Sequence, residues 1–155
     1  MARLWPGSPA AFALHEYLSL LGHSFAGFHA LILLGDHYTN FSLLQVLLPF
    51  ATWNYKPVWV GLGQLGFYAW GLVAISFYVR KRIGQNTWRV LHYLSFLTYA
   101  GALVHGLASG TDSSLPWVQD FYWLTGASFL FLLIARIVNS LMLRVEKRLA
   151  KPAKG

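Results

Sequence analysis

Residues 13–34 read ALHEYLSLLGHSFAGFHALILL, and this hydrophobic stretch decides the fold of the chain. It carries His15 and His29, whose spacing of fourteen residues covers about 20 Å of α-helix. The two histidines would then lie near opposite edges of a hydrocarbon layer about 30 Å thick. Ionisable side chains are costly at such depths and are usually functional there. The stretch is therefore predicted to span a membrane and to carry a functional pair of histidines.

A second hydrophobic stretch repeats this pattern. Residues 90–108 read VLHYLSFLTYAGALVHGLA and carry His92 and His105, thirteen residues apart. One return segment separates the two stretches, so both would cross the membrane in the same direction. His15 and His92 would then face each other toward the inside, and His29 and His105 toward the outside. Because imidazole is a good ligand for haem iron, this arrangement predicts two haem b groups with bis-histidine ligation, stacked across the membrane.

The composition favours an integral membrane protein. Of the 155 residues, 56% are hydrophobic and 11% are charged, whereas soluble domains are about 25% charged. Each hydrophobic stretch is close to the roughly 20 residues that a spanning helix needs, and the alternation typical of barrel strands is not evident. We therefore predict an all-α membrane protein with one transmembrane haem-binding domain, residues 1–155. Its four transmembrane helices are expected at residues 11–34, 57–79, 88–108 and 118–142.

The net charge of +7 predicts an orientation in the membrane rather than nucleic-acid binding. Basic residues gather in the second loop, at 80–82, and in the tail, whereas the first and third loops hold Asp36, Asp112 and Asp120. This positive-inside pattern predicts a multi-pass membrane protein with both termini in the cytoplasm. The basic clusters would contact anionic membrane lipid or an acidic partner.

Two loops carry local signals. In the first outer loop, residues 41–50 read FSLLQVLLPF, which is apolar but too short to span, and Tyr38 and Trp53 flank it. We expect an interfacial helix there. In the second loop, Asn86 and Thr87 are expected to cap the third spanning helix.

The angular positions of the histidines agree with paired ligation on one helix but not on the other. On an ideal helix, a spacing of fourteen residues places His15 and His29 within about 40° of each other around the axis. A spacing of thirteen residues leaves His92 and His105 about 140° apart. Either the helix is distorted near residues 100–102, or the outer haem is approached from another direction. Two other interpretations are hydrogen bonds between helices and transport of protons or metal ions. Cysteine is absent, which excludes thiolate metal sites on this chain.

Other polar residues in the hydrophobic stretches have weaker assignments. Arg89 and Arg136 are expected to lie near the negatively charged propionates of the inner haem, and Lys56 is a weaker candidate at the outer side. Snorkelling to lipid headgroups would also explain Arg89. His23 has no histidine at its depth on another segment, so a hydrogen bond or a place beside a cofactor is expected. His37 is expected to be solvated in the outer loop.

The chain resembles the ferric reductase-like transmembrane family, which includes the membrane parts of NADPH oxidases and ferric reductases. The resemblance covers residues 13–36, 53–68 and 77–113, and the histidine spacing is the family's own. Its most specific parts are the motifs WRxLHxxSF around His92 and HGLxxGTDS from His105. The resemblance implies an inner haem between His15 and His92. It implies an outer haem between His29 and His105.

The chain departs from the family pattern in two ways. Family members commonly have two helices before the first histidine helix, and these are not found here. We expect either a shortened variant or a subunit whose neighbours supply that wall. The flavin- and NADPH-binding domain is also missing, because GLGQLG at residues 61–66 lies in a predicted membrane helix and not in a nucleotide loop.

The sequence thus predicts a dihaem b-type subunit that carries electrons between the two faces of a membrane. It would be the electron-transfer component of an oxidoreductase rather than a complete enzyme, within a complex with other membrane subunits. Its separate redox partner would be a flavoprotein or a quinol, and a quinone could bind beside Trp59, Tyr68 and Trp70. The alternative is a structural or accessory subunit whose haem sites are empty or vestigial.

Overall fold

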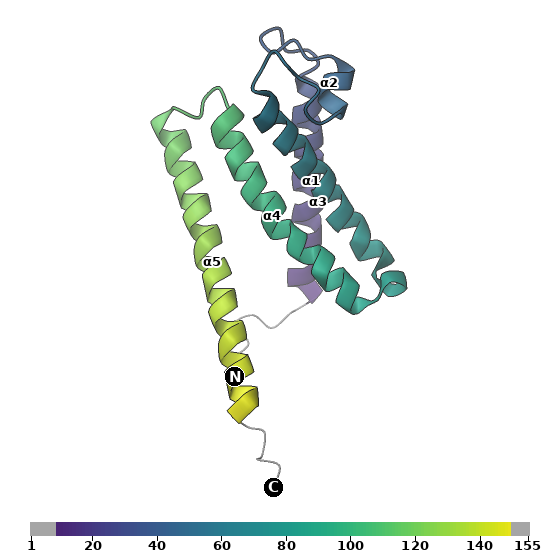
Figure 1. Cartoon of the computed structure of the whole chain (residues 1–155), viewed down its shortest axis with the longest axis vertical. Coiled ribbons are helices and arrows are strands. Elements are labelled where there is room, and N and C mark those ends of the chain that lie inside the picture. Colours follow the sequence, from purple (N-terminus) through teal and green to yellow (C-terminus); the bar gives the residue numbers. More distant parts are fainter. Residues whose placement is uncertain (1–8, 150–155) are drawn as a thin grey trace. The chain divides into compact units, whose positions relative to one another are not determined.

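The computed structural model of the protein describes residues 9–149 (Figure 1). These residues are helical or irregular and contain no strand, so the prediction of an all-α protein is confirmed. The described helices are α1 (Pro9–Ile32), α2 (Leu43–Leu47), α3 (Pro57–Ile83), α4 (Gln85–Ser109) and α5 (Pro116–Leu149).

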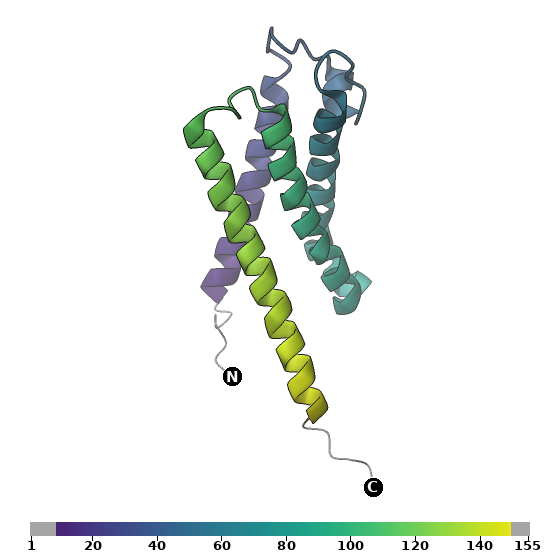
Figure 2. The ribbon, with the colours of Figure 1, turned by 60° about the vertical axis from the view of Figure 1, so that its left-hand side comes forward.

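The chain divides into two compact units, Met1–Gly110 and Thr111–Gly155. In the first unit α4 packs along α3, and α1 packs against α3 less extensively. Figure 2 shows α3 and α4 side by side as an antiparallel hairpin. Within the described residues, α1 and α4 do not pack closely against each other. The second unit consists mainly of the single long helix α5.

Among the described residues, three helices are long and apolar enough to cross a membrane: α3, α4 and residues 116–146 of α5. The 24-residue helix α1 is long enough but does not join this group. Its three histidines and Glu16 lower its hydropathy. Three of the four predicted spans therefore meet the criteria of length and composition.

A single glycine joins α3 to α4. The sequence predicts a loop from residue 80 to 87, but α3 continues to Ile83 and α4 begins at Gln85. Gly84 adopts a φ of 85°, which glycine reaches without steric cost. Its N–H bonds to the Arg80 carbonyl, and its own carbonyl accepts from the N–H of Trp88. The predicted cap at Asn86 and Thr87 is therefore wrong, because Gly84 occupies the N-cap position.

The helix expected at residues 41–50 is shorter than predicted. Ser42 starts α2 with a capping box in which its side chain and that of Gln45 bond to each other's backbone N–H. Leu48 is extended (φ −98°, ψ 120°) because the following Pro49 disfavours the helical conformation. The leucines of α2 are exposed and leave an apolar surface. This surface agrees with the expected interfacial position, which stays a prediction.

Hydrogen bonds fasten the first loop to the α3–α4 hairpin. The Gln64 amide donates to the Gln45 and Val46 carbonyls, both at 2.7 Å, and the Tyr68 hydroxyl donates to the Leu47 carbonyl. These carbonyls lie at the end of α2, where no further helical turn satisfies them.

Two side chains of the same loop cap the end of α4. The Tyr55 hydroxyl donates to the Ser109 carbonyl at 2.7 Å, and the Lys56 ammonium donates to the Ala108 carbonyl at 2.8 Å. A positive charge at a helix C-terminus also complements the helix dipole. The end of the first unit that carries the first loop is therefore held together by polar contacts as well as by the buried Phe41 and Val60.

Candidate functional site

His15 of α1 and His92 of α4 lie opposite each other. Their ring centroids are 6.2 Å apart, and the ring planes make an angle of 77°. A bond from a metal to an imidazole nitrogen is about 2 Å long, and that nitrogen lies about 1 Å from its ring centroid, so two imidazoles on opposite sides of one metal have centroids about 6 Å apart. At this separation the imidazoles of His15 and His92 would be able to hold one metal ion between them.

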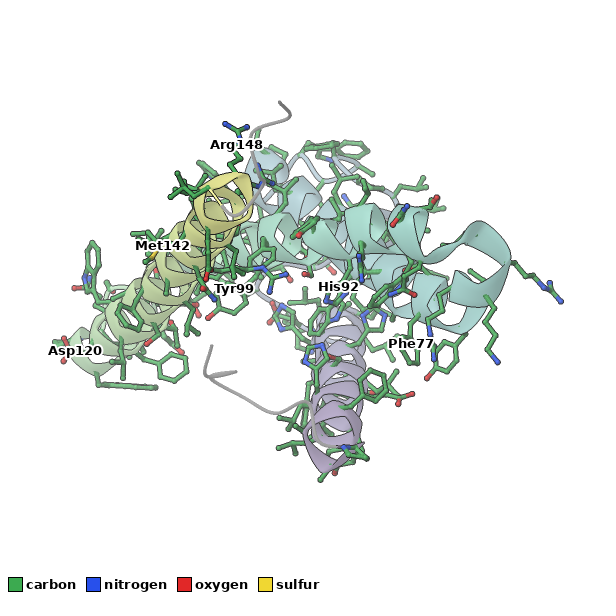
Figure 3. All side chains as sticks on the ribbon, turned by 90° about the horizontal axis from the view of Figure 1, so that it is seen from below. Phe77, His92, Tyr99, Asp120, Met142 and Arg148 are labelled. Carbon is green, nitrogen blue, oxygen red and sulfur yellow. The ribbon has the colours of Figure 1, made fainter. Side chains whose placement is uncertain are left out.

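A cavity of about 480 Å³ adjoins this pair. Sites for cofactors and small molecules commonly measure about 300–1,000 Å³. Side chains from three helices of the first unit line the cavity: Phe12, His15, Glu16, Ser19, Leu20, Trp70, Val73, Ala74, Phe77, Tyr78, Trp88, His92, Ser95, Thr98, Tyr99 and Ala102. Figure 3 looks along the helices from below, with the lining residues Phe77, His92 and Tyr99 labelled. Such a wall suits a large, mostly apolar group.

The number of protein ligands fits a haem. Catalytic and structural zinc sites draw three or four ligands from the protein, whereas a haem iron needs only axial ligands from its surroundings. No group of three histidine, cysteine or acidic side chains gathers as a metal site among residues 9–149. A facing pair of imidazoles beside a cavity is the donor set that a bis-histidine haem requires.

Aromatic packing supports the His92 side of the cavity. The Trp88 ring stacks on the His92 ring, with centroids 5.1 Å apart and planes at 26°. Trp88 also packs against Phe77, which in turn contacts Phe12 of α1. Sequence reasoning missed Trp88 as a site residue. Its position one turn before His92 was the available signal, since residues four apart share a helix face.

A polar pair joins α1 to α3 at the same cavity. The Tyr78 hydroxyl donates to a carboxylate oxygen of Glu16 at 3.0 Å. Both residues line the cavity, and neither was singled out as a site residue from the sequence. This bond gives the carboxylate of α1 a partner within the protein.

The second pair, His29 and His105, lies at the other end of the unit. They belong to α1 and α4, as His15 and His92 do. The Nδ1 atom of His105 lies 2.8 Å from the Trp59 carbonyl oxygen. A carbonyl can only accept, so Nδ1 carries the proton and Nε2 keeps a lone pair for a metal. Histidines that bind metals usually donate their other N–H in this way.

The angular problem on α4 has a structural answer. The helix runs without interruption from Gln85 to Ser109, so it is not distorted near residues 100–102. His92 instead faces His15 of α1, whereas His105 contacts α3. The two histidines of α4 therefore point in different directions, and the approach of an outer haem from another direction stays a prediction.

His23 does not form the expected hydrogen bond. Its ring stacks on Phe67, with centroids 4.3 Å apart and planes at 8°, and meets Trp70 edge to face at 5.4 Å. Its Nδ1 atom is buried and has no hydrogen-bond partner. His23 thus serves as an aromatic packing residue between α1 and α3. His37 is exposed in the loop between α1 and α2, as expected.

Two of the predicted propionate partners, Arg89 and Lys56, do not line the cavity. Arg89 is exposed and absent from the lining residues, and Arg136 is on α5 in the second unit. Lys56 already donates to the Ala108 carbonyl. Instead, the Arg80 guanidinium lies 3.7 Å from the ring centroid of the lining residue Phe77 and donates to its carbonyl. The cation–π contact holds this charge beside the cavity wall.

Comparison of the chain with protein-family models, with curated proteins and with solved structures finds no match. The resemblance to the ferric reductase-like family therefore depends on the histidine spacing and on the motifs around His92 and His105. In the structure, His15 and His92 face each other, and His105 contacts the Trp59 carbonyl.

Proposed function

We propose that this protein is a dihaem b-type electron-transfer subunit of a prokaryotic cytoplasmic membrane. The observation that carries the proposal is the 6.2 Å separation of the His15 and His92 rings beside a large apolar cavity. His29 and His105 would hold a second haem toward the other face. Each haem, when bound, supplies a one-electron redox couple whose potential depends on its ligands and surroundings.

The proposal includes α1 as a fourth membrane span. At about 1.5 Å per residue, its 24 residues cover about 36 Å, which is enough to cross the hydrocarbon layer. His15 and Glu16 line the cavity, and His23 packs on α3. Polar residues within membranes normally face the protein interior and pair there. In this proposal, His15, Glu16 and His23 therefore face the protein interior and not the lipid, although they lower the hydropathy of α1.

The side chains of the protein have distinct tasks in this proposal. The imidazoles of the four histidines are neutral ligands. The aromatic wall, including Trp70 and Phe77, excludes water and lowers the local dielectric constant, which helps to set the potential. The basic residues at 80–82 mark the cytoplasmic end of the α3–α4 hairpin.

Other chains would supply and remove the electrons. We infer a flavoprotein or a quinol as the donor, as expected for an electron-transfer component within a membrane complex. A quinone could bind beside one of the haems, with Trp59, Tyr68 and Trp70 as its lining.

A visible spectrum and a haem count test the proposal. The purified protein should show reduced b-type bands and contain about two haems per chain, the number set by its two histidine pairs. His15→Ala and His92→Ala should each remove one haem, whereas the matched control His37→Ala should retain both. A folded wild-type protein that takes up no haem would point instead to a structural subunit.

A further inference from the structure

We propose that Gly63 is a positioning residue for the outer ligand His105. The missing side chain leaves space for the imidazole Nδ1–H to reach the Trp59 carbonyl. Because this bond keeps the proton on Nδ1, Nε2 is the nitrogen that can bind the outer cofactor. The assignment of a cofactor to Nε2 rests on the proposed function. The hydrogen bond and the close approach of Gly63 stand on geometry alone.

The hydrogen bond defines one tautomer of His105. Its Nδ1 atom is 2.8 Å from the carbonyl oxygen of Trp59, a normal length for an N–H···O bond. Neutral imidazole has one donor nitrogen and one acceptor nitrogen, and the hydrogen bond decides which is which. Since the carbonyl oxygen accepts, the proton is on Nδ1.

Gly63 is necessary for this contact. A Cβ atom at position 63 would lie 2.5 Å from Nδ1 and 2.6 Å from Cε1 of His105. These separations are shorter than side chains tolerate, so any other residue would displace the ring. Trp59 and Gly63 are four residues apart and therefore lie on the same face of α3. The missing side chain opens the path from the ring to the carbonyl.

Gly66 provides a matched comparison on the same helix. A Cβ atom at position 66 would meet nothing within 4 Å. Gly63→Ala and Gly66→Ala thus make the same chemical change less than one turn apart. Both changes also raise helix propensity to the same extent. Only the Cβ atom of Gly63→Ala would contact His105.

The bond should also affect the metal. Donation from Nδ1–H makes the opposite nitrogen a stronger electron donor. A stronger donor favours oxidised iron and lowers its reduction potential. Displacing the ring from the Trp59 carbonyl should therefore raise the potential of the outer haem or release that haem.

The first experiment needs no cofactor. Nitrogen-15 NMR of the haem-free protein in detergent should show His105 as the Nδ1–H tautomer, with the resonance assigned by its loss in His105→Gln. Gly63→Ala should shift the resonance toward a mixture of tautomers, and Gly66→Ala should leave it unchanged. A wild-type His105 that carries its proton on Nε2 would overturn the proposal, even if Gly63→Ala does not fold.

The second experiment uses the haem-loaded protein. Redox titration and low-temperature EPR should show that Gly63→Ala raises the potential of one haem or removes its low-spin signal, with the other haem unaffected. Gly66→Ala should match the wild type in both measurements. If both variants match the wild type, Gly63 has no positioning role. If the wild type takes up no haem, the proposed function fails, whereas the NMR result still decides the role of Gly63.

Discussion

The imidazole rings of His15 and His92 come within 6.2 Å of each other although their helices, α1 and α4, do not pack closely. Each helix is held instead by α3. The two histidines thus face each other across a cavity, and a bound group that joins them would connect α1 to α4.

The first prediction concerns stability. A group that binds the folded protein alone stabilises it by about 2.7 kcal/mol at a free concentration 100 times its dissociation constant. We therefore expect haem to raise the temperature of unfolding of the detergent-solubilised protein. Thermal unfolding followed by circular dichroism would measure this shift. His92→Ala should reduce it, and an equal shift in that variant would show that haem does not bind at this pair.

The second prediction concerns the packing of α1 on α3. A Cβ atom at Gly22 would lie 2.8 Å from Cη2 of Trp70, a residue that lines the cavity. Gly22→Ala should therefore force the indole to move, at a cost of about 1–3 kcal/mol for overpacking. Denaturant titration in mixed micelles would report the loss. Gly101→Ala is the control, because a Cβ atom there meets nothing within 4 Å.

The third prediction concerns the outer loop. Gln64→Leu removes two hydrogen bonds to the end of α2, each worth about 1 kcal/mol. We expect faster amide hydrogen exchange in residues 43–47, while exchange in the middle of α4 stays unchanged. The exposed Gln119 offers the same substitution on α5 as a control. Equal exchange rates in Gln64→Leu and the wild type would contradict a fastening role for this side chain.

The fourth prediction concerns pH. The Thr39 hydroxyl at 2.7 Å and the backbone N–H groups of Thr39 and Tyr38 donate to the Asp36 carboxylate, and these bonds hold its pKa below the ordinary value of 3.8. Because the folded pKa is the lower one, the carboxylate stabilises the turn above pH 3.8. This stabilisation is lost as the pH falls through the folded pKa.

An NMR titration of the Thr39 amide would test this dependence on pH. The amide resonance should move as the pH falls below 3.8 in the wild type and remain constant in Asp36→Asn, which has no group that titrates there. A Thr39 resonance that moves equally in both proteins would show that another group controls the turn.

The sequence predicted the helices better than their ends. Hydrophobic length alone located the four long helices, because that pattern is strong and local. The prediction of a loop at residues 80–87 was wrong, because Gly84 by itself reverses the chain. The interfacial helix was predicted too long, because Pro49 ends α2 earlier than its apolar pattern indicates.

The candidate site was predictable only in part. The spacing along the chain identified the four histidines as candidate ligands. The structure places the rings of His15 and His92 close together. The role of the Trp59 carbonyl could not be predicted, because a backbone atom leaves no signal in residue type. Arg89 was chosen for its charge and its nearness in sequence to His92, and its place beside a propionate stays a prediction. Which side chains meet between two helices depends on how each helix is rotated about its axis, and the spacing of residues along the chain does not determine that rotation.

The two directions in which α4 presents its histidines also restrict how that helix can change. Turning α4 about its own axis would carry His92 away from α1 and His105 away from α3 at once, because both rings belong to one rigid rod. A mutation that rotates one end of α4 should therefore also displace the histidine at the other end. The contacts of His92 and His105 thus depend together on the rotation of α4.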